Sequence, residues 1–447
     1  MTHHLILGAG PAGVIAAETI RKHAPNDSIT LVGDEPEPPY SRMAIPYLLM
    51  GNIAERGTHL RKSDTHFSDL KINVIQARAK QVDVANKSVV LDNGQTLKFD
   101  RLLIATGSVP VNPPIPGINS AGVHHCWTMD DARKIMALAV PGARVLQLGA
   151  GFIGCIIMEA LAARGVQLSV VEMGDRMVPR MMGPTAGGMI KDWCEAKGVK
   201  VHTGARVESI TPAGTGGGLI SKIATALGVG SDAPAGALSV RLSTGQVIEA
   251  DLMISAAGVK PAIGFLENSG ITCLQGVLTD EHLQTNVPGI YAAGDCAEAF
   301  DKVSSKTIVS AIQPNAAEQA RVAALNMVGQ PTALKGVTQI NVLDTLGLVS
   351  TSFGNWEGVA GGEHVELTDK GAGRHLSLQF NGGVMIGCNS VGWTEHVGVM
   401  RGLVEGAIPL GDWKDRLLHD PTQLMAAYLA CAQGQGQWSG AADERRR

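Results

Sequence analysis

The chain has 447 residues, of which 45% are hydrophobic and 17% are charged, which excludes an intrinsically disordered protein and allows two or three domains. The formal net charge is −4 and there is no long basic run, so a nucleic acid is not expected as the main partner. We find no apolar run of membrane-spanning length and no N-terminal segment that resembles a signal peptide. We therefore expect no membrane association and a cytoplasmic location, which the seven scattered cysteines also favour.

The first element is an apolar strand at residues 5–7 that runs directly into a Gly-x-Gly-x-x-Gly sequence. An alanine-rich helix over residues 14–22 follows. In this pattern Gly8 permits a tight turn, Gly10 lets the backbone approach a pyrophosphate, and Gly13 allows close packing of helix on strand. The positive end of the helix would then hold the pyrophosphate.

A second strand is expected at residues 30–32 and leads to Asp34, an acid at about the spacing of a ribose ligand. The prolines up to residue 39 exclude a helix there, and a short helix is expected near residues 43–50. Between them lies Arg42, which is either a solvated cation or a contact to a bound phosphate. The opening therefore predicts a dinucleotide-binding βαβ unit.

Residues 73–99 show strand-like patterns with a turn at Asn93-Gly94. A buried strand then ends in the tripeptide Ala105-Thr106-Gly107, which places small residues where the backbone can meet a bound ligand. Four prolines within residues 110–117 indicate a crossing into another domain.

A second glycine motif follows the apolar strand at residues 145–148 and contains Gly149, Gly151 and Gly154. A helix to residue 164 and a strand at residues 167–171 come next, and Glu172 ends that strand. Two complete phosphate-binding motifs in one chain predict two bound dinucleotides.

Residues 212–237 are expected to form a loop insertion with no function of their own. Beyond it, one strand closes on small residues at Gly258 and another ends in Ala293-Gly294-Asp295. The Asp295 carboxylate either contacts a bound ligand or caps a turn. The next helix begins near residue 313, and its N-terminal dipole could face a ring that carries partial negative charge.

Residues 331–447 have a different pattern, with strands followed by helices, a hairpin turn at Asn381-Gly382 and a helix start at Asp420-Pro421. Four of the six tryptophans fall in this part of the chain. A small α+β domain of this kind suits dimerisation or partner docking, although the tryptophans could equally serve ordinary core packing.

Together these motifs resemble the FAD-dependent pyridine nucleotide–disulfide oxidoreductase superfamily. The resemblance implies an α/β fold with two Rossmann-like dinucleotide-binding domains, as in glutathione reductase, and a C-terminal α+β interface domain. The FAD-binding domain would comprise residues 1–110 and 256–330. The NAD(P)H-binding domain would comprise residues 111–255, and the interface domain residues 331–447.

By this resemblance Asp34 binds the FAD adenosine ribose, Arg42 lies near the flavin nucleotide and Asp295 binds the ribityl chain. Glu172 would bind the NADH ribose and repel a 2′-phosphate, which favours NADH over NADPH, although the nearby Arg176 could soften that preference. The full set of predicted cofactor-binding residues is Gly8, Gly10, Pro11, Ala12, Gly13, Asp34, Glu35, Arg42, Ala105, Thr106, Gly107, Gly149, Gly151, Phe152, Ile153, Gly154, Glu172, Gly258, Gly294, Asp295 and Asn315.

The chain departs from the family pattern near the flavin. Met43 stands where members that reduce coenzyme A disulfide or peroxide have a single cysteine. No cysteine spacing here matches a redox-active pair, so disulfide reduction by a protein thiol is not expected. Tyr47 and Ile156 replace a lysine and a glutamate that form an ion pair in many members, and Glu159 could partly substitute. These near-flavin positions are candidates only; we predict no certain catalytic residue and no metal site.

The segment around Arg42 is similar to flavin reductases of rubredoxin, ferredoxin and nitrite-reductase systems, and to FAD subunits of multi-component aldehyde or 2-oxoacid oxidoreductases. We therefore predict an FAD-dependent oxidoreductase that exchanges electrons between NADH and an iron–sulfur carrier or partner subunit, with a possible homodimer. Flavin suits this role because it accepts a hydride and releases electrons singly. The alternatives are an NADH oxidase that reduces oxygen, and a nucleotide-binding redox-sensing or assembly module.

Overall fold

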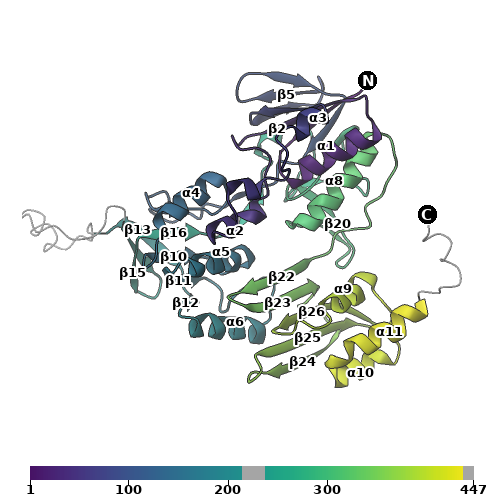
Figure 1. Cartoon of the computed structure of the whole chain (residues 1–447). Coiled ribbons are helices and arrows are strands. Elements are labelled where there is room, and N and C mark those ends of the chain that lie inside the picture. The colour runs from purple at the N-terminus through teal and green to yellow at the C-terminus, as the bar shows by residue number, and fades with distance from the viewer. Residues whose placement is uncertain (214–236, 436–447) are drawn as a thin grey trace, which may run out of the picture. The chain divides into compact units, whose positions relative to one another are not determined.

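The computed structural model describes residues 1–213 and 237–435, and it divides into two compact units (Figure 1). Unit 1 comprises residues 1–113, 124–137 and 257–337. Unit 2 comprises residues 114–123, 138–256 and 338–447. The assignment of FAD, NAD(P)H and interface domains to particular residues stays a prediction.

Unit 1 is built on a five-stranded sheet in the order β19-β7-β1-β2-β3, with all neighbouring pairs parallel. Its strands are β1 (His3–Leu7), β2 (Ser28–Gly33), β3 (Ile72–Gln76), β7 (Arg101–Ile104) and β19 (Ile290–Ala292). Most strand residues are buried, because the sheet is covered on both faces. The runs predicted from residues 5–7 and 30–32 are the inner strands β1 and β2.

Successive residues of β1 point to opposite faces of this sheet. Ile6 packs with helices α1 (Pro11–His23) and α8 (Gln313–Met327), which lie against each other. Leu5 and Leu7 pack on the other face against an antiparallel sheet. Its strands are β4 (Ala79–Asp83), β5 (Ser88–Leu91) and β6 (Thr96–Lys98). The β5–β6 turn contains Gly94 at φ +85°, as its sequence predicts.

Shorter elements complete unit 1. They are η1 (Arg42–Ala44), α2 (Ile45–Leu49), η2 (Glu55–Thr58), α3 (His66–Asp69), β8 (Ser108–Pro110), α4 (Met129–Leu138, of which the last residue belongs to unit 2), β17 (Val259–Pro261), η3 (Gly264–Leu266), β18 (Val277–Leu278), β20 (Ala297–Asp301) and β21 (Lys306–Val309).

Unit 2 repeats the same plan around the second glycine motif. Its core sheet has the order β12-β11-β10-β16-β9, and the pairs β12–β11, β11–β10 and β10–β16 are parallel. The strands are β12 (Lys200–Thr203), β11 (Gln167–Glu172), β10 (Arg144–Leu148), β16 (Leu252–Ser255) and β9 (Val123–His124, of which the last residue belongs to unit 1). Helix α5 (Phe152–Ala163) contacts β10 and β11, and α6 (Pro184–Ala196) contacts β12. An antiparallel sheet of β13 (Val207–Pro212), β14 (Leu238–Leu242) and β15 (Val247–Ala250) shares a hydrophobic core with the parallel strands.

The predicted loop insertion joins two adjacent strands of that antiparallel sheet. Pro212 at the end of β13 lies opposite Leu238 at the start of β14. The insertion's residues 214–236 lie outside the described part of the chain.

The C-terminal part of unit 2 is an antiparallel sheet followed by helices, as predicted. The order is β22 (Ile340–Thr345), β23 (Leu348–Gly354), β26 (Val384–Val391), β25 (Arg374–Asn381) and β24 (Glu363–Asp369), and the helices are α9 (Val397–Gly406), α10 (Trp413–His419), η4 (Pro421–Gln423) and α11 (Leu424–Gln435). Strand β22 packs on α5 and β26 on α6. Asp420 caps η4 by accepting from the Thr422 amide at 3.0 Å.

The hairpin turn between β25 and β26 lies one residue later than predicted. It is formed by Gly382-Gly383, since Asn381 still pairs with Val384.

Over residues 1–213 and 237–435, no helix has both the length and the apolar character that a membrane crossing requires.

Candidate dinucleotide-binding sites

The first glycine turn excludes side chains at two of its three glycines. Gly8 has φ +112°, and a Cβ there would lie 2.0 Å from the Ala105 carbonyl oxygen. A Cβ at Gly13 would lie 1.8 Å from the Gly8 carbonyl oxygen. Gly10 is different, because its φ is −77° and a Cβ would meet nothing within 4 Å. The space above Gly10 is therefore the cradle that a ligand pyrophosphate would fill.

The N-terminus of α1 is suited to an anion at this cradle. Gly10 is the N-cap and offers no side chain to the first turn, and Pro11 occupies the first helical position. The first turn has no acidic residue. Its backbone N–H groups and the positive end of the helix dipole are thus directed at the cradle, which fits the pyrophosphate of FAD.

The two acids after β2 make different contacts. Asp34 is exposed, and its Oδ2 accepts from Arg78 Nε at 3.0 Å and Nη2 at 2.7 Å. Glu35 accepts from Arg42 Nη2 at 2.8 Å and from the Tyr40 hydroxyl at 2.6 Å. Glu35 therefore orients Arg42, whereas Asp34 lies at the strand end where a ribose ligand is expected. Their roles toward FAD stay predictions.

Arg42 and Asp295 belong to one network. The Arg42 guanidinium carbon lies 5.0 Å from the centre of the Trp127 ring, and Trp127 Nε1 donates to the Ser108 carbonyl at 3.1 Å. The Ser108 hydroxyl donates to Asp295 Oδ2 at 2.8 Å. Burial raises the pKa of Asp295, and the Ser108 hydrogen bond and the Arg42 charge partly oppose this shift. The network links a half-buried cation to a half-buried carboxylate, and the Arg42 charge acts on Asp295.

Gly294 brings Asp295 up to the first glycine turn. Gly294 has φ +82°, and a Cβ on it would lie 3.3 Å from the Ala12 Cβ and 3.5 Å from the Ala316 Cβ. Its amide donates to Gln319 Oε1 at 2.7 Å. The N-terminal turns of α1 and α8 therefore meet beside Asp295. A single cofactor site that includes both turns and Asp295 would need this arrangement.

The small residues after β7 and β16 border open space. Gly107 has φ +67° and Gly258 has φ +108°, and a Cβ at either would meet nothing within 4 Å. Thr106 donates to the Ala262 carbonyl at 2.9 Å, so its side chain supports the backbone. Asn315, in the first turn of α8, donates to a serine hydroxyl at 2.7 Å. Contact of these residues with FAD stays a prediction.

The second glycine turn has the same geometry. Gly149 has φ +99°, and a Cβ at Gly154 would lie 2.5 Å from the carbonyl oxygen of Gly149. Gly151, the N-cap of α5, has φ −76° and open space around a Cβ. Phe152 and Ile153 form the first helical turn, which has no acidic residue. This second cradle fits the pyrophosphate of NADH for the same reasons as the first fits FAD.

Glu172 is held against this turn by the backbone. Its Oε2 accepts from the Ala150 amide at 2.8 Å and its Oε1 from the Gly174 amide at 2.8 Å. Arg176 instead donates to the Met182 carbonyl at 2.9 Å and to Asp175 at 2.8 Å. The backbone thus fixes the Glu172 carboxylate at the end of β11, and its contact with a ribose stays a prediction.

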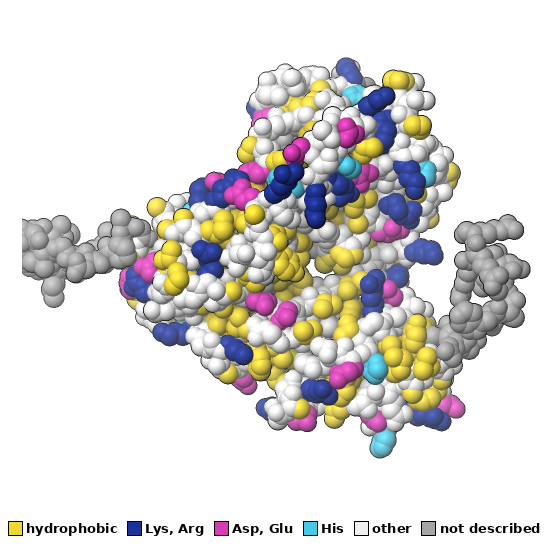
Figure 2. Space-filling view, in the orientation of Figure 1, with side chains coloured by type: hydrophobic (Ala, Val, Ile, Leu, Met, Phe, Trp, Pro, Cys, Tyr) yellow, Lys and Arg dark blue, Asp and Glu magenta, His cyan; other side chains and the backbone are white. Residues whose placement is uncertain are grey.

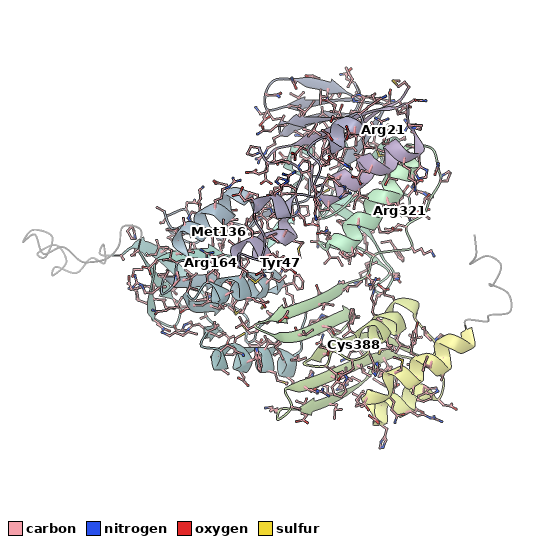
Figure 3. The ribbon with its side chains drawn as sticks, viewed as in Figure 1. Arg21, Tyr47, Met136, Arg164, Arg321 and Cys388 are labelled. Atoms are coloured by element: carbon pink, nitrogen blue, oxygen red, sulfur yellow. The ribbon has the colours of Figure 1, made fainter. Side chains whose placement is uncertain are left out.

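The near-flavin candidates are divided between the two units. Met43 and Tyr47 lie in unit 1 and are 50% and 54% exposed, and Figure 3 shows Tyr47 on α2. Ile156 and Glu159 lie on α5 in unit 2. Burial and the Asp344 carboxylate raise the pKa of Glu159. The roles of all four toward the flavin stay predictions.

The seven cysteines are all free. Burial raises the pKa of Cys126 to about 12 and that of Cys388 to about 12, so both are thiols at neutral pH. Thiolate chemistry at these two cysteines is therefore unfavourable.

Over the described ranges 1–213 and 237–435, no three His, Cys, Asp or Glu side chains gather as metal ligands would.

The family model of the pyridine nucleotide-disulphide oxidoreductases matches residues 2–323. The chain belongs to this family. It is an FAD-dependent NAD(P)H oxidoreductase, with FAD and NADH as its cofactors. The resemblance carried by the two glycine motifs together with Ala105-Thr106-Gly107 and Ala293-Gly294-Asp295 is confirmed.

Similar proteins include several NADH-dependent enzymes. Subunit epsilon of the NADH-dependent phenylglyoxylate dehydrogenase of Aromatoleum evansii is 30% identical over 423 residues, which cover 94% of this chain and 95% of the relative. An NADH oxidase of Methanocaldococcus jannaschii is 28% identical, with 78% and 76% covered. The NADH-rubredoxin oxidoreductase of Clostridium acetobutylicum is 26% identical, with 80% and 82% covered.

Solved structures confirm the predicted fold class. Putidaredoxin reductase, in its covalent complex with putidaredoxin, superposes with a TM-score of 0.83 at 21% identity, covering 95% of this chain and 98% of that one. An NAD-dependent persulfide reductase from A. fulgidus gives a TM-score of 0.81 at 26% identity, covering 92% and 78%. The fold is therefore shared along nearly the whole chain.

Sequence reasoning missed several residues of the sites. The prediction did not include three residues that contact predicted ones. Trp127 contacts Arg42, and Ser108 donates to Asp295. Arg78 donates to Asp34. One signal was present, since Thr128 and Asp131 form a capping box that predicts a helix start directly after Trp127. Ser108 and Arg78 carry no such signal, because only long-range packing brings them to their acids.

Proposed function

We propose that this chain uses FAD to oxidise NADH and passes the electrons to a separate iron–sulfur carrier protein or partner subunit. The observation that carries this proposal is that none of the seven cysteines, all of which lie in the described ranges 1–213 and 237–435, is placed as a reactive thiol. Met43 is exposed where members that reduce coenzyme A disulfide or peroxide have a cysteine. The seven cysteines are free, and burial raises the pKa of each one. The electrons therefore need an acceptor outside the chain.

The relatives support an external acceptor. The Aromatoleum evansii protein aligns almost end to end with this chain and is by its name a subunit of an NADH-dependent dehydrogenase. The Clostridium acetobutylicum protein is named for rubredoxin. Electron flow toward NAD⁺ uses the same site, so the proposal covers both directions. A homodimer and a cytoplasmic location are parts of the proposal, the latter supported by the free cysteines.

Particular residues would hold each cofactor. The cradle above Gly10 would bind the FAD pyrophosphate, with Asp34 on the adenosine ribose and Asp295 on the ribityl chain. The cradle above Gly151 would bind the NADH pyrophosphate, with Glu172 on its adenosine ribose. When bound, FAD accepts a hydride and can return the electrons singly, so these residues bind and orient and none needs to exchange a proton.

We assign residues 1–110 and 256–330 to FAD binding, residues 111–255 to NAD(P)H binding and residues 331–447 to an interface. Trp127 is an exception within the second segment, because it contacts Arg42 and lies in unit 1. Half-buried tryptophans in the last segment, among them Trp356 and Trp393, support an interface role. On the face shown in Figure 2, basic and acidic side chains are interspersed. Steering of a carrier should therefore be local, with a modest dependence on salt.

The test compares electron acceptors for the purified, FAD-loaded chain. We expect rapid NADH-dependent reduction of one-electron dyes, of a ferredoxin and of a rubredoxin, and slow reduction of oxygen. A protein that folds but contains no flavin and takes none up would refute the proposal. Reduction of a dye with no iron–sulfur protein accepting electrons would refute the assignment of the partner.

The second candidate is an NADH oxidase, which the Methanocaldococcus jannaschii relative favours. Stoichiometric oxygen consumption with NADH, at a rate equal to or above that of any carrier, would establish this alternative. Oxygen electrode measurements with and without an added ferredoxin separate the two.

A further inference from the structure

The loop after Glu172, residues 173–183, contacts the second glycine turn. The Val178 amide donates to the Ala150 carbonyl at 2.9 Å, while the Ala150 amide donates to Glu172 at 2.8 Å. Both backbone polar groups of Ala150 are thus engaged, one by the acid and one by the loop. The position of the glycine turn therefore depends on where this loop lies.

The loop holds an unfavourable backbone conformation at this contact. Val178 is buried and has φ +46°, a left-handed conformation that a β-branched residue rarely adopts. Its carbonyl accepts from the amides of Met181 and Met182, each at 3.0 Å. Such a conformation persists only where the surroundings impose it. The far end of the loop must therefore be anchored.

Asn389 of strand β26 provides this anchor. Its side-chain Oδ1 accepts from the Gly183 amide at 2.9 Å, and its Nδ2 donates to the Met181 carbonyl at 2.9 Å. Asn389 is 2% exposed, and Figure 3 shows its neighbour Cys388 on the same strand. The amide side chain supplies the donor and the acceptor from two separate atoms, one for each backbone group. Gly183 is also the N-cap of α6 and has no side chain with which to cap it.

A second bond supports the same stretch, since Arg176 Nε donates to the Met182 carbonyl. Asn389 nevertheless differs in origin, because it belongs to the C-terminal sheet and not to the dinucleotide-binding fold. The chain of contacts runs from Asn389 to residues 181–183, then to Val178, and from there to Ala150.

We propose that Asn389 is a positioning residue for NADH, which ties the C-terminal sheet to the glycine turn and the ribose-binding acid of the second site. The proposal rests on the assignment of that site to NADH. Loss of the two Asn389 hydrogen bonds lets the loop relax at Val178 and moves the Ala150 carbonyl and the Glu172 carboxylate. Binding of the adenosine and pyrophosphate half of NADH then weakens, whereas FAD binding and the hydride step stay unchanged.

The experiment uses the full-length, FAD-loaded protein and ADP-ribose, which carries only the half of NADH that the loop positions. Asn389→Ala removes both hydrogen bonds to the loop, the one from the Gly183 amide and the one to the Met181 carbonyl. Ser390→Ala is the matched control, since Ser390 is equally buried on the same strand and hydrogen bonds to Thr351 at 2.7 Å instead of to the loop. The readouts are the Kd of ADP-ribose by calorimetry, the KM of NADH, kcat with a dye, and the flavin content.

Two lost hydrogen bonds lead us to expect about a tenfold rise in the Kd of ADP-ribose and in the KM of NADH for Asn389→Ala. We expect its kcat and flavin content to match the wild type, and Ser390→Ala to match the wild type in every readout. Asn389→Asp keeps the acceptor for Gly183 but replaces the donor by a charged oxygen that faces the Met181 carbonyl, so it should raise the Kd as well. If both Asn389 variants bind ADP-ribose as the wild type does, the proposal is wrong.

Hydrogen exchange on the wild type keeps the test decisive if neither variant folds. ADP-ribose should slow exchange at residues 178–183 and in β26 as well as at the glycine turn. Protection confined to the glycine turn would refute the proposal. A wild type that binds no NADH or ADP-ribose would instead refute the proposed function itself.

Discussion

The guanidinium of Arg42 lies over the indole ring of Trp127, with 5.0 Å between the guanidinium carbon and the ring centre. The same indole donates to the Ser108 carbonyl at 3.1 Å, and the Ser108 hydroxyl donates to Asp295. A tryptophan just before α4 thus connects the cation after β2 with the carboxylate after β19. FAD affinity should therefore depend on Trp127, although this residue carries no charge.

Replacing Trp127 by alanine should weaken FAD binding by about tenfold, because it removes a cation–π contact and a hydrogen bond from the Arg42 network. Phenylalanine at this position keeps the ring and should give an intermediate affinity. The measurement is flavin fluorescence during titration of the stripped protein with FAD. Trp413→Ala removes a similar stacking on Arg416 in unit 2 and should leave FAD affinity unchanged.

The three glycines of the first turn should respond differently to substitution. Gly10→Val should give a folded protein without flavin, because its side chain enters open space that the pyrophosphate needs. Gly8→Ala should destabilise the fold by roughly 3 kcal/mol or more, because its methyl group meets the Ala105 carbonyl and the backbone has φ +112°. Circular dichroism with flavin absorbance distinguishes these outcomes. A Gly10→Val protein that keeps FAD would contradict the assigned cradle.

The charge of Glu172 should set the preference for NADH over NADPH. We expect the wild type to favour NADH by at least about tenfold in kcat/KM, because the fixed carboxylate repels a 2′-phosphate. Glu172→Gln removes the charge at constant size and should bring the two values closer together. Glu195→Gln, on the exposed side of α6, is the control and should leave the ratio unchanged. Equal kcat/KM values in the wild type would count against this role.

Stability should fall between pH 7 and pH 5 because of His4. Burial lowers the pKa of His4 below its ordinary value of 6.5, and Arg101 and His3 lower it further, against an opposing effect of Asp27. A histidine whose folded pKa is lowered contributes stability above 6.5 that is lost as the pH falls below 6.5. A tenfold difference in proton affinity between the folded and unfolded protein corresponds to about 1.4 kcal/mol of the free energy of unfolding.

Urea unfolding of the FAD-loaded protein at several pH values tests this dependence. His4→Gln should flatten the fall in the free energy of unfolding between pH 7 and pH 5. His23→Gln changes an exposed histidine at the end of α1 and should preserve the wild-type slope. An unchanged slope in His4→Gln would show that other groups cause the acid sensitivity.

No cysteine should be needed for turnover. Burial raises the pKa of Cys126 to about 12, so near neutral pH it carries too little thiolate to act as a nucleophile. Cys126→Ser is the most stringent test, because this residue precedes Trp127 in the Arg42 network. It should retain its flavin and keep NADH-driven dye reduction within about twofold of the wild type. Loss of turnover with FAD still bound would contradict the prediction.

The two nucleotide motifs could be identified from residue spacing because each is a local arrangement. A strand, a glycine turn and a helix lie in one continuous stretch, so the spacing of Gly8, Gly10 and Gly13 already encodes the turn geometry that the structure shows. The acid Glu172 could be placed for a similar reason, since parallel strands of a βαβ unit end at the same edge of the sheet. The repetition of this pattern was enough to recognise the family.

The supporting contacts could not be predicted in this way, because they join segments far apart in the chain. Arg78 reaches Asp34, Trp127 reaches Arg42, and Asn389 reaches the loop before α6 only after the sheets have formed and their helices have packed. Hydrogen bonds of this kind depend on side-chain direction and burial, on which residue spacing places no constraint. The sequence pattern predicted strands within residues 331–447, but only tertiary packing brought Asn389 of β26 to the N-terminus of α6. The backbone amide of Gly183 needed a hydrogen-bond acceptor, and the fold supplied one from a distant strand.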